Sequence, residues 1–304
     1  MIDKSKNIGR VVELSGQRVK IFDGDDYITA VVKGRIKYGD RDVSPIAVGD
    51  YVEYSQGKGK IAAVETIQPR ITVLSKPAVE KKELLQILVS NIDRLVIVTS
   101  IVNPLFKPGL VDRFLVMAFK EDIKPVVVLN KTDLQSPDSV RNYFDSWRSI
   151  SCETIFTSAL TGDGLDELKN VLEHGTSVIA GHSGVGKSSL LNRISPDLKL
   201  KTREVSRSSD RGVHTTSRVS LYRLFPNGWV ADTPGLKVFG LAGVDRKSLR
   251  KYFPEFERCD SECRFNNCVH IDEPGCAVKK SIETEDGKIA GFRYESYLRI
   301  YAKL

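Results

Sequence analysis

The segment GHSGVGKSS, residues 181–189, constrains the fold of this chain more than any other. The β-branched, apolar stretch TSVIAG runs into it and the helix-forming stretch KSSLLNRI leaves it, which is the strand–loop–helix context of a phosphate-binding loop. Glycines let backbone N–H groups turn toward phosphate oxygens, and the start of the helix adds a positive dipole. The spacing Gly181-x4-Gly186-Lys187-Ser188 therefore predicts a nucleotide site in an α/β domain; a glycine-rich turn without a ligand is the alternative.

The residue types in this loop follow from phosphate chemistry. Lys187 is expected to neutralise charge on the β- and γ-phosphates, and Ser188 to ligate Mg²⁺. The nucleotide-binding residues expected here are Gly181, His182, Ser183, Gly184, Val185, Gly186, Lys187, Ser188 and Ser189.

A second motif, Asp-Thr-Pro-Gly, follows the apolar strand NGWVA. Asp232 is placed to hold Mg²⁺ through a water molecule, and the amide of Gly235 to reach the γ-phosphate. The motif is short, but its strand context and its distance from the phosphate loop favour this interpretation.

Two further motifs predict that the base is guanine. Asn-Lys-Thr-Asp follows the buried strand KPVVVLN, where open α/β sheets place their ligands. The carboxylate of Asp133 can accept both N1–H and N2–H of guanine, which adenine does not offer, so GTP is favoured and an ATP-dependent kinase or ATPase is disfavoured. Ser-Ala-Leu follows another strand, and a backbone amide there is placed to meet O6. The base-binding residues expected are Asn130, Lys131, Thr132, Asp133, Ser158, Ala159 and Leu160.

These motifs occur in a rotated order along the chain. In the usual GTPase the phosphate loop comes first and the guanine motifs last, whereas here residues 130–133 and 158–160 precede residues 181–189 and 232–235. Rotation preserves three-dimensional contacts if the old termini are joined, and domain termini lie close enough for this. The sequence therefore predicts a circularly permuted GTPase, joined through residues 168–181.

A polar, basic stretch, residues 195–218, follows the phosphate-loop helix and is expected to be the switch that closes on nucleotide. Residues 193–223 hold eight Lys/Arg against three Asp/Glu, which suits a polyanionic partner, although a solvated loop is the alternative. Thr215 or Thr216 is expected to ligate Mg²⁺. Leu236 stands where many GTPases carry a water-orienting Gln, so intrinsic turnover should be slow, and His214 is the candidate to orient the water; a surface histidine is the alternative.

Residues 1–68 contain short strands separated by turn signals, which predict a small closed barrel that resembles an OB-fold. Such barrels often bind nucleic acid through basic and aromatic side chains, although a purely structural barrel is the alternative. The RNA-contacting candidates are Lys33, Arg35, Lys37, Tyr38 and Arg41.

Four of the five cysteines fall between Cys259 and Cys276. The run Cys263-x4-Cys268-x-His270-x5-Cys276 supplies three thiolates and one imidazole, which predicts one structural Zn²⁺ with no open position for a catalytic water. An arrangement that uses Cys259 in place of Cys263 stays open. The following stretch GKIAGFRYESYLRIYAKL is expected to be a helix.

Together these residues resemble the bacterial small ribosomal subunit biogenesis GTPase family, which is circularly permuted and has an N-terminal OB-fold and a C-terminal zinc domain. The resemblance covers essentially the whole chain and depends on GHSGVGKSS, NKTD, GVHTTS, DTPGLKVFGL and the cysteine–histidine run. The family's apolar residue in place of Gln matches Leu236, and its switch histidine matches His214. The run Thr215-Thr216-Ser217 departs mildly from the family pattern, which leaves the Mg²⁺ ligand open.

The resemblance implies a three-part chain: an all-β OB-fold barrel that binds RNA (1–68), a circularly permuted α/β P-loop GTPase (69–241) and a mostly α zinc-binding domain (242–304). It also implies binding to the 30S particle and its 16S rRNA near the decoding region late in maturation, GTP hydrolysis stimulated by that particle, and release after hydrolysis. An RNA-binding scaffold for which GTP is mainly a structural ligand is the alternative.

No apolar run approaches the roughly 20 residues that span a bilayer, and Met1 to Arg10 lacks the apolar core of a signal peptide. We therefore expect a cytoplasmic protein without a membrane partner, acting as a monomer with GTP or GDP and Mg²⁺.

Overall fold

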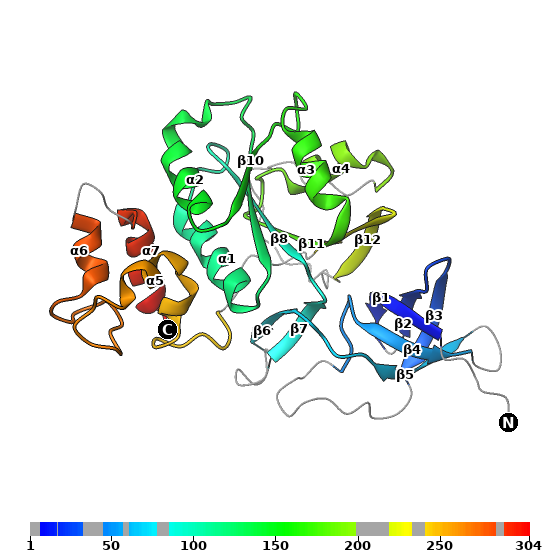
Figure 1. Cartoon of the computed structure of the whole chain (residues 1–304). Coiled ribbons are helices and arrows are strands. Elements are labelled where there is room, and N and C mark those ends of the chain that lie inside the picture. Colours follow the sequence, from blue (N-terminus) through cyan, green and yellow to red (C-terminus); the bar gives the residue numbers. More distant parts are fainter. Residues whose placement is uncertain are drawn as a thin grey trace, which may run out of the picture.

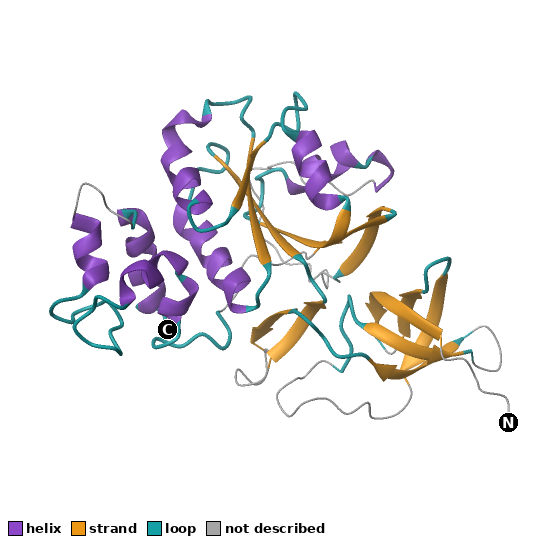
Figure 2. Cartoon of the chain, in the orientation of Figure 1, coloured by secondary structure: helices purple, strands orange, loops and turns teal. Residues whose placement is uncertain are grey.

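The computed structural model describes residues 7–16, 18–32, 45–56, 61–77, 85–198, 219–232, 241–283 and 289–304. Figure 1 shows a strand barrel beside the N-terminus, an α/β layer structure in the middle and a helical part at the C-terminus, and Figure 2 separates them by element type. This is the multi-domain architecture that the sequence predicts.

The N-terminal part is a closed five-stranded barrel. Each strand pairs with two others, in the circular order β1–β2–β3–β5–β4–β1, and only the β3–β5 pair is parallel. Apolar side chains that alternate along the strands fill its interior, including Val11, Val19, Ile21, Val52 and Val64. The strands are β1 (Asn7–Ser15), β2 (Arg18–Phe22), β3 (Tyr27–Val32), β4 (Tyr51–Ser55) and β5 (Ala62–Ile67).

The central part contains a mostly parallel sheet in the strand order β10-β9-β8-β11-β13-β12, and only β12 is antiparallel to its neighbour. The apolar runs in the sequence are the buried strands, because both faces of the sheet are covered. The strands are β8 (Arg94–Ser100), β9 (Lys124–Asn130), β10 (Glu153–Phe156), β11 (His174–Ala180), β12 (Ser220–Phe225) and β13 (Asn227–Asp232).

Helices cover the two faces of this sheet in pairs. Figure 1 shows α1 (Pro108–Lys120) and α2 (Arg141–Arg148) on one side, with α3 (Leu165–Leu172) and α4 (Lys187–Ile194) on the other. Short 3₁₀ turns, Pro137–Val140 and Pro196–Leu198, precede α2 and follow α4. Buried residues of the first pair, among them Phe114 and Trp147, belong to one apolar core, and those of the second pair, among them Leu168 and Leu190, to another.

The sequence did not indicate how the barrel is attached. A hairpin of β6 (Val73–Pro77) and β7 (Leu85–Ser90) lies between the two parts, and the residue pair Glu13–Ser220 links β1 to β12, so that barrel and central sheet form one hydrogen-bonded sheet. The buried carboxylate of Asp50 accepts bonds from Arg70 Nε (2.7 Å), Arg70 Nη2 (2.8 Å) and Ser90 Oγ (2.6 Å). These contacts join the barrel to the hairpin.

The C-terminal part packs against α1. It consists of the 3₁₀ turns Leu249–Tyr252 and Pro254–Phe256 and the helices α5 (Glu257–Asp260), α6 (Ala277–Glu283) and α7 (Gly291–Tyr301). The expected C-terminal helix is α7, and the sequence did not indicate α6. Among the described residues, no helix is long and apolar enough to cross a membrane.

A fully buried arginine ties this part to the GTPase helices. Arg293 of α7 donates from Nε to Oε1 of Glu255 (2.6 Å) and from Nη1 to Oδ1 of Asp112 in α1 (2.5 Å). The same Asp112 oxygen accepts a bond from Nε1 of Trp147 in α2 (2.8 Å). Buried charges need such partners because burial without them is costly.

We expect Trp147→Phe to lower the free energy of unfolding by about 1.5–3 kcal/mol, because it removes a hydrogen bond to a charged, buried acceptor. Urea unfolding of the variant and the parent measures the difference. A loss below about 0.5 kcal/mol would mean that this bond does not stabilise the docked helices.

Candidate nucleotide and metal sites

The parallel strands bring the predicted nucleotide motifs to one edge of the sheet. Ser100 pairs with Asn130, Leu129 pairs with Phe156, and Ile179 pairs with Asp232. The strands β8, β9, β10, β11 and β13 therefore end side by side, and the loop that follows each of them lies at the same edge.

The phosphate loop connects β11 to α4 and requires glycine at its two ends. Gly181 has φ +137°, and a Cβ there would lie 2.1 Å from the carbonyl oxygen of Val98. Gly186 has φ +96°, and a Cβ there would lie 2.2 Å from Nδ2 of Asn130. Other residues would meet both strain and collision, so the spacing in the sequence reflects backbone geometry.

Lys187 begins α4 and its side chain folds back over the loop. Its Nζ donates to the carbonyl oxygens of Gly181 and His182, each at 2.8 Å. Ser188 and Ser189 occupy the first turn of the same helix, and the N-terminal turn of a helix favours anions. This cluster of donors can hold phosphate oxygens.

Asn130, at the end of β9, connects the loop that follows it to the phosphate loop and to the loop after β10. Its Nδ2 donates to the carbonyl oxygen of Val185 in the phosphate loop (2.8 Å), and its Oδ1 accepts from the backbone N–H of Ala159 (3.2 Å). The sequence predicted contact with the nucleotide for Asn130 but did not indicate this cross-link. The amide therefore fixes the phosphate loop relative to the loop containing residues 158–160.

Asp133 is held in place by the loop after β10. Its Oδ1 accepts from Oγ of Ser158 (2.5 Å), and that hydroxyl oxygen accepts in turn from the N–H groups of Leu160 (3.2 Å) and Thr161 (3.1 Å). The carboxylate is exposed, so its remaining acceptor positions are available to a base. The two guanine motifs thus support each other through one hydroxyl group.

Lys131 and Thr132 complete the loop after β9. Lys131 has φ +68°, and its Nζ donates to the carbonyl oxygen of Asn103. Burial lowers the pKa of Lys131, and the nearby charge of Asp133 opposes that shift. Thr132 donates from N and from Oγ1 to the carbonyl oxygen of Thr157, at 3.2 and 3.1 Å. The loop is therefore fixed by the two residues that directly precede Asp133.

Several predicted residues lie outside the described part of the chain. The backbone of Asp232 ends β13, but its side chain is not described. Other predicted residues lie wholly outside the described part: Gly235 and Leu236, the switch residues His214, Thr215 and Thr216, and the barrel candidates Lys33, Arg35, Lys37, Tyr38 and Arg41. Their roles remain predictions.

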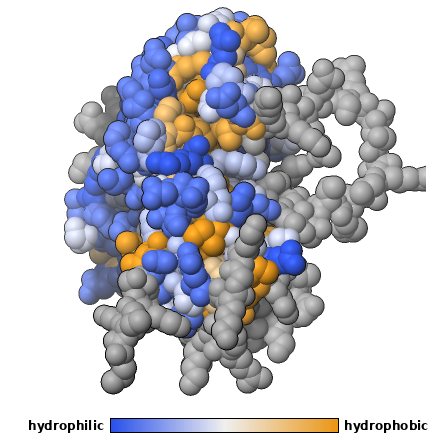
Figure 3. All heavy atoms as spheres, turned by 90° about the vertical axis from the view of Figure 1, so that its right-hand side faces the viewer, coloured by the Kyte–Doolittle hydropathy of each residue, from blue (hydrophilic) through white to orange (hydrophobic). Residues whose placement is uncertain are grey.

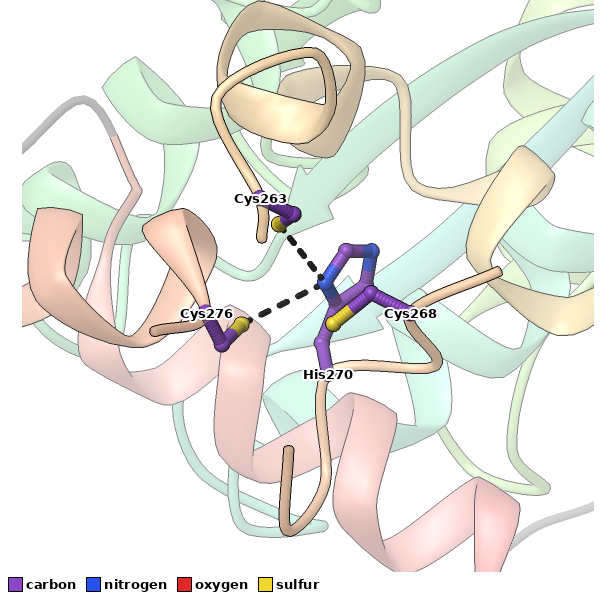
Figure 4. A group of neighbouring side chains, drawn as sticks. All are labelled: Cys263, Cys268, His270 and Cys276. Carbon is purple, nitrogen blue, oxygen red and sulfur yellow. Dashed lines mark hydrogen bonds between the residues drawn. The ribbon is translucent and has the colours of Figure 1, made fainter. Parts of the chain in front are cut away.

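Four residues of the C-terminal part form a candidate metal centre (Figure 4). The ligand atoms of Cys263, Cys268, His270 and Cys276 all lie within 4.8 Å of one another, and all four side chains are buried. Nδ1 of His270 lies 3.4 Å from Sγ of Cys276 and 3.7 Å from Sγ of Cys263. These separations fit a tetrahedral ion with bonds of about 2.0–2.3 Å, and Cys259 is not part of the group.

The chemistry of these ligands also suits a cation. Burial, with smaller contributions from Cys276 and Cys263, raises the pKa of the Cys268 thiol to about 12, so the thiolates need a positive charge among them. Burial lowers the pKa of His270, which favours the neutral, metal-binding imidazole. The residues therefore fit a bound metal ion.

Asp260, an acidic residue that the sequence did not indicate, lies beside Nε2 of His270, on the side of the ring away from the cysteines. Oδ1 of Asp260 lies 3.4 Å from Nε2 of His270 without forming a hydrogen bond, while Nη1 of Arg250 donates to both oxygens of Asp260 at 2.7 Å. Carboxylates commonly orient metal-binding histidines from this position. The only signal in the sequence was an acid next to Cys259 in the stretch ERCDSEC.

The nucleotide motifs lie within a segment that matches a known protein family. The family model described as RsgA GTPase matches residues 67–242, which is more than half of the chain. The chain belongs to the RsgA GTPase family. It is therefore a GTP hydrolase, and GTPases use Mg²⁺.

Relatives of this RsgA-family chain cover almost its whole length. "Small ribosomal subunit biogenesis GTPase RsgA" of Christiangramia forsetii is 38% identical over 96% of this chain and 95% of its own. The protein of the same name from a Geobacillus species is 38% identical over 93% and 94%. Solved structures agree: YjeQ from Thermotoga maritima has a TM-score of 0.80 at 33% identity, covering 98% of both chains.

A second solved structure bears on the order of the motifs. YloQ, described as a circularly permuted GTPase, has a TM-score of 0.76 at 29% identity and covers 100% of this chain and 96% of its own. The predicted fold class, including the permuted order of the GTPase part, is confirmed.

Proposed function

We propose that this GTPase binds the small (30S) ribosomal subunit late in its maturation, that the subunit stimulates GTP hydrolysis, and that hydrolysis releases the factor. Relatives that match almost end to end carry the name of a small ribosomal subunit biogenesis GTPase, and this observation supports the proposal most strongly. Its RNA partner would be 16S rRNA. The protein would act as a monomer in the cytoplasm, with no membrane partner.

The proposed roles of the residues follow the geometry of the sheet edge. Asp133 would accept N1–H and N2–H of guanine, with its carboxylate oriented by Ser158. The backbone of residues 158–160 would meet O6, and Lys131 and Thr132 would border the base. The amides of residues 181–186, together with Lys187, would hold the phosphates. Asn130 would act mainly by fixing these loops to one another.

Magnesium would be held at the same edge by Ser188 and, through water, by Asp232, with Thr215 or Thr216 added when the switch closes. The amide of Gly235 would contact the γ-phosphate. Leu236 cannot orient a water molecule, so His214 is proposed for that task once the subunit is bound. This division predicts slow turnover in the free protein.

The metal centre would hold one structural Zn²⁺. Three thiolates and one imidazole are typical of zinc, and four protein ligands leave no position open for catalysis. Zinc would fix the ligand segment, residues 263–276, against α7, whose Tyr294 and Tyr297 donate to the carbonyl oxygens of His270 and Val269.

We expect GTP turnover to rise at least tenfold with purified small subunits, and to stay at the basal rate with large subunits or with neither. His214→Ala should remove most of that rise while binding to the subunit is kept, because the variant loses only the water-orienting group. Multiple-turnover phosphate release and co-sedimentation measure the two quantities. The control is His174→Ala, which changes an exposed histidine at the start of β11.

The scaffold alternative gives a different result in the same experiment. If GTP is only a structural ligand, the subunit binds but turnover stays basal in the parent protein. That outcome would exclude the coupled release proposed here.

A further inference from the structure

Glu273 lies between two of the candidate metal ligands, three residues after His270 and three residues before Cys276, and is not itself one of the four ligand residues. Figure 1 shows this C-terminal part at the opposite end of the molecule from the barrel, which lies on the side that faces the viewer in Figure 3. An effect of Glu273 on the metal centre can therefore be measured without a change in the barrel.

The carboxylate of Glu273 binds the backbone on both sides of His270. Its Oε1 accepts from the N–H of Val269 (2.8 Å), and its Oε2 accepts from the N–H of Ile271 (2.9 Å). We call this pair of hydrogen bonds the Glu273 clamp. One carboxylate thus spans the residue that carries the imidazole.

The backbone of His270 needs such support. Its φ is +61°, a conformation that residues other than glycine adopt rarely. Helix α7 holds the same stretch from the other side, because Tyr297 donates to the carbonyl oxygen of Val269 and Tyr294 to that of His270, both at 2.6 Å. No metal-ligand atom takes part in these bonds or in the clamp, so the bonds and a bound ion can be present together.

The clamp requires an ionised carboxylate. Burial alone would raise the pKa of Glu273, but the backbone N–H groups of Val269, Glu273 and Ile271 outweigh burial and lower that pKa. A carboxylate offers two acceptor oxygens, one for each N–H group, whereas an amide offers one acceptor and one donor. Asp260 has a different position, because it faces the ring of His270 at Nε2 and not the backbone.

We propose that Glu273 is a positioning residue for the metal centre, and that its clamp holds the backbone of His270 so that Nδ1 stays directed at the cysteine sulfurs. Nδ1 lies 3.4 Å from Sγ of Cys276 and 3.7 Å from Sγ of Cys263 (Figure 4). Groups outside the ligand set commonly fix ligand orientation in this way. That the ion is zinc rests on the proposed function.

The test is the zinc affinity of the full chain, measured by competition with a chromogenic chelator. Glu273→Ala should weaken zinc binding about 10- to 100-fold, because it removes both bonds of the clamp. Glu273→Gln should weaken it about three- to tenfold, as expected for loss of one hydrogen bond, and it carries the comparison if the alanine variant does not fold. Asp272→Ala, which removes an exposed carboxylate from the same loop, is the matched control and should stay within about twofold of the parent.

A double-mutant cycle separates positioning from general stabilisation. His270→Ala removes the group through which the clamp acts and leaves three thiolates to bind zinc. In that background Glu273→Ala should change the zinc affinity by less than about twofold, since the two residues act as one unit. General stabilisation of the loop would give the full loss in both backgrounds.

Substitution with Co²⁺ gives a spectroscopic readout of the same effect. The ligand-field bands of tetrahedral Co²⁺ should weaken in Glu273→Ala, because the imidazole is no longer held in place. The control Asp272→Ala should keep the parent spectrum.

Two results would overturn the proposal: additive losses in the cycle, or zinc binding in Glu273→Ala that equals the parent's. The second result, with one zinc ion in the parent, would remove the clamp and keep the zinc assignment. A parent chain that binds no metal would remove both. None of these measurements uses subunits or GTP, so failure of the ribosomal proposal is detected separately.

Discussion

Replacing Asp133 with Asn should weaken GTP binding by at least about a hundredfold and create a preference for xanthosine triphosphate. The carboxylate is placed to accept two N–H groups of guanine, and each hydrogen bond to a charged acceptor contributes about 1.5–3 kcal/mol. An amide offers one acceptor and one donor, which match the N–H and the 2-oxo group of xanthine. The specificity should therefore be reversed rather than merely lost.

Titration calorimetry with GTP and xanthosine triphosphate, on the same preparations, measures the reversal. Ser158→Ala should weaken GTP binding to a smaller extent, about tenfold, because the carboxylate remains but loses the hydroxyl that orients it at 2.5 Å. The control Asp145→Asn changes an exposed aspartate on α2 and should leave both affinities as in the parent. Unaltered GTP affinity in the Asp133 variant would show that this carboxylate does not contact the base.

The parts of the fold that the sequence predicted are those with a local cause. Positive φ and close backbone contacts require the glycines of the phosphate loop. Apolar runs indicate the buried strands, and the ligand spacing within fourteen residues indicates the metal cluster. Each of these patterns is contained in one short stretch. The meeting of the motif loops at one edge of the sheet then follows, because parallel strands end together.

The parts that the sequence missed depend on contacts between distant segments. Arg293 stands in an amphipathic helix and looks like a solvated cation, yet it is buried because Asp112 and Glu255, 181 and 38 residues away, meet it. The pairing of Glu13 with Ser220 is equally nonlocal. At the candidate site, the same is true of the bond from Asn130 to Val185. Spacing along one segment carries no information about such partners.

Loss of the metal should disorganise the C-terminal part while the nucleotide edge persists. We expect Cys268→Ser to reduce zinc content from one ion per chain to near zero, since a serine hydroxyl replaces one of three thiolates. The elements around the cluster are short, with four residues in α5 and seven in α6, so they cannot persist as isolated helices. Structural zinc contributes about 10 kcal/mol in comparable small sites.

Elemental analysis gives the metal and its stoichiometry, and limited proteolysis reports order in residues 257–283. The matched control is Cys259→Ser, because Cys259 is equally buried and adjacent in sequence but lies outside the cluster. The control should keep one zinc ion and resist protease, whereas Cys268→Ser should be cleaved quickly and bind GTP within severalfold of the parent. Zinc retained in Cys268→Ser but lost in Cys259→Ser would assign the ligands differently and contradict the geometry in Figure 4.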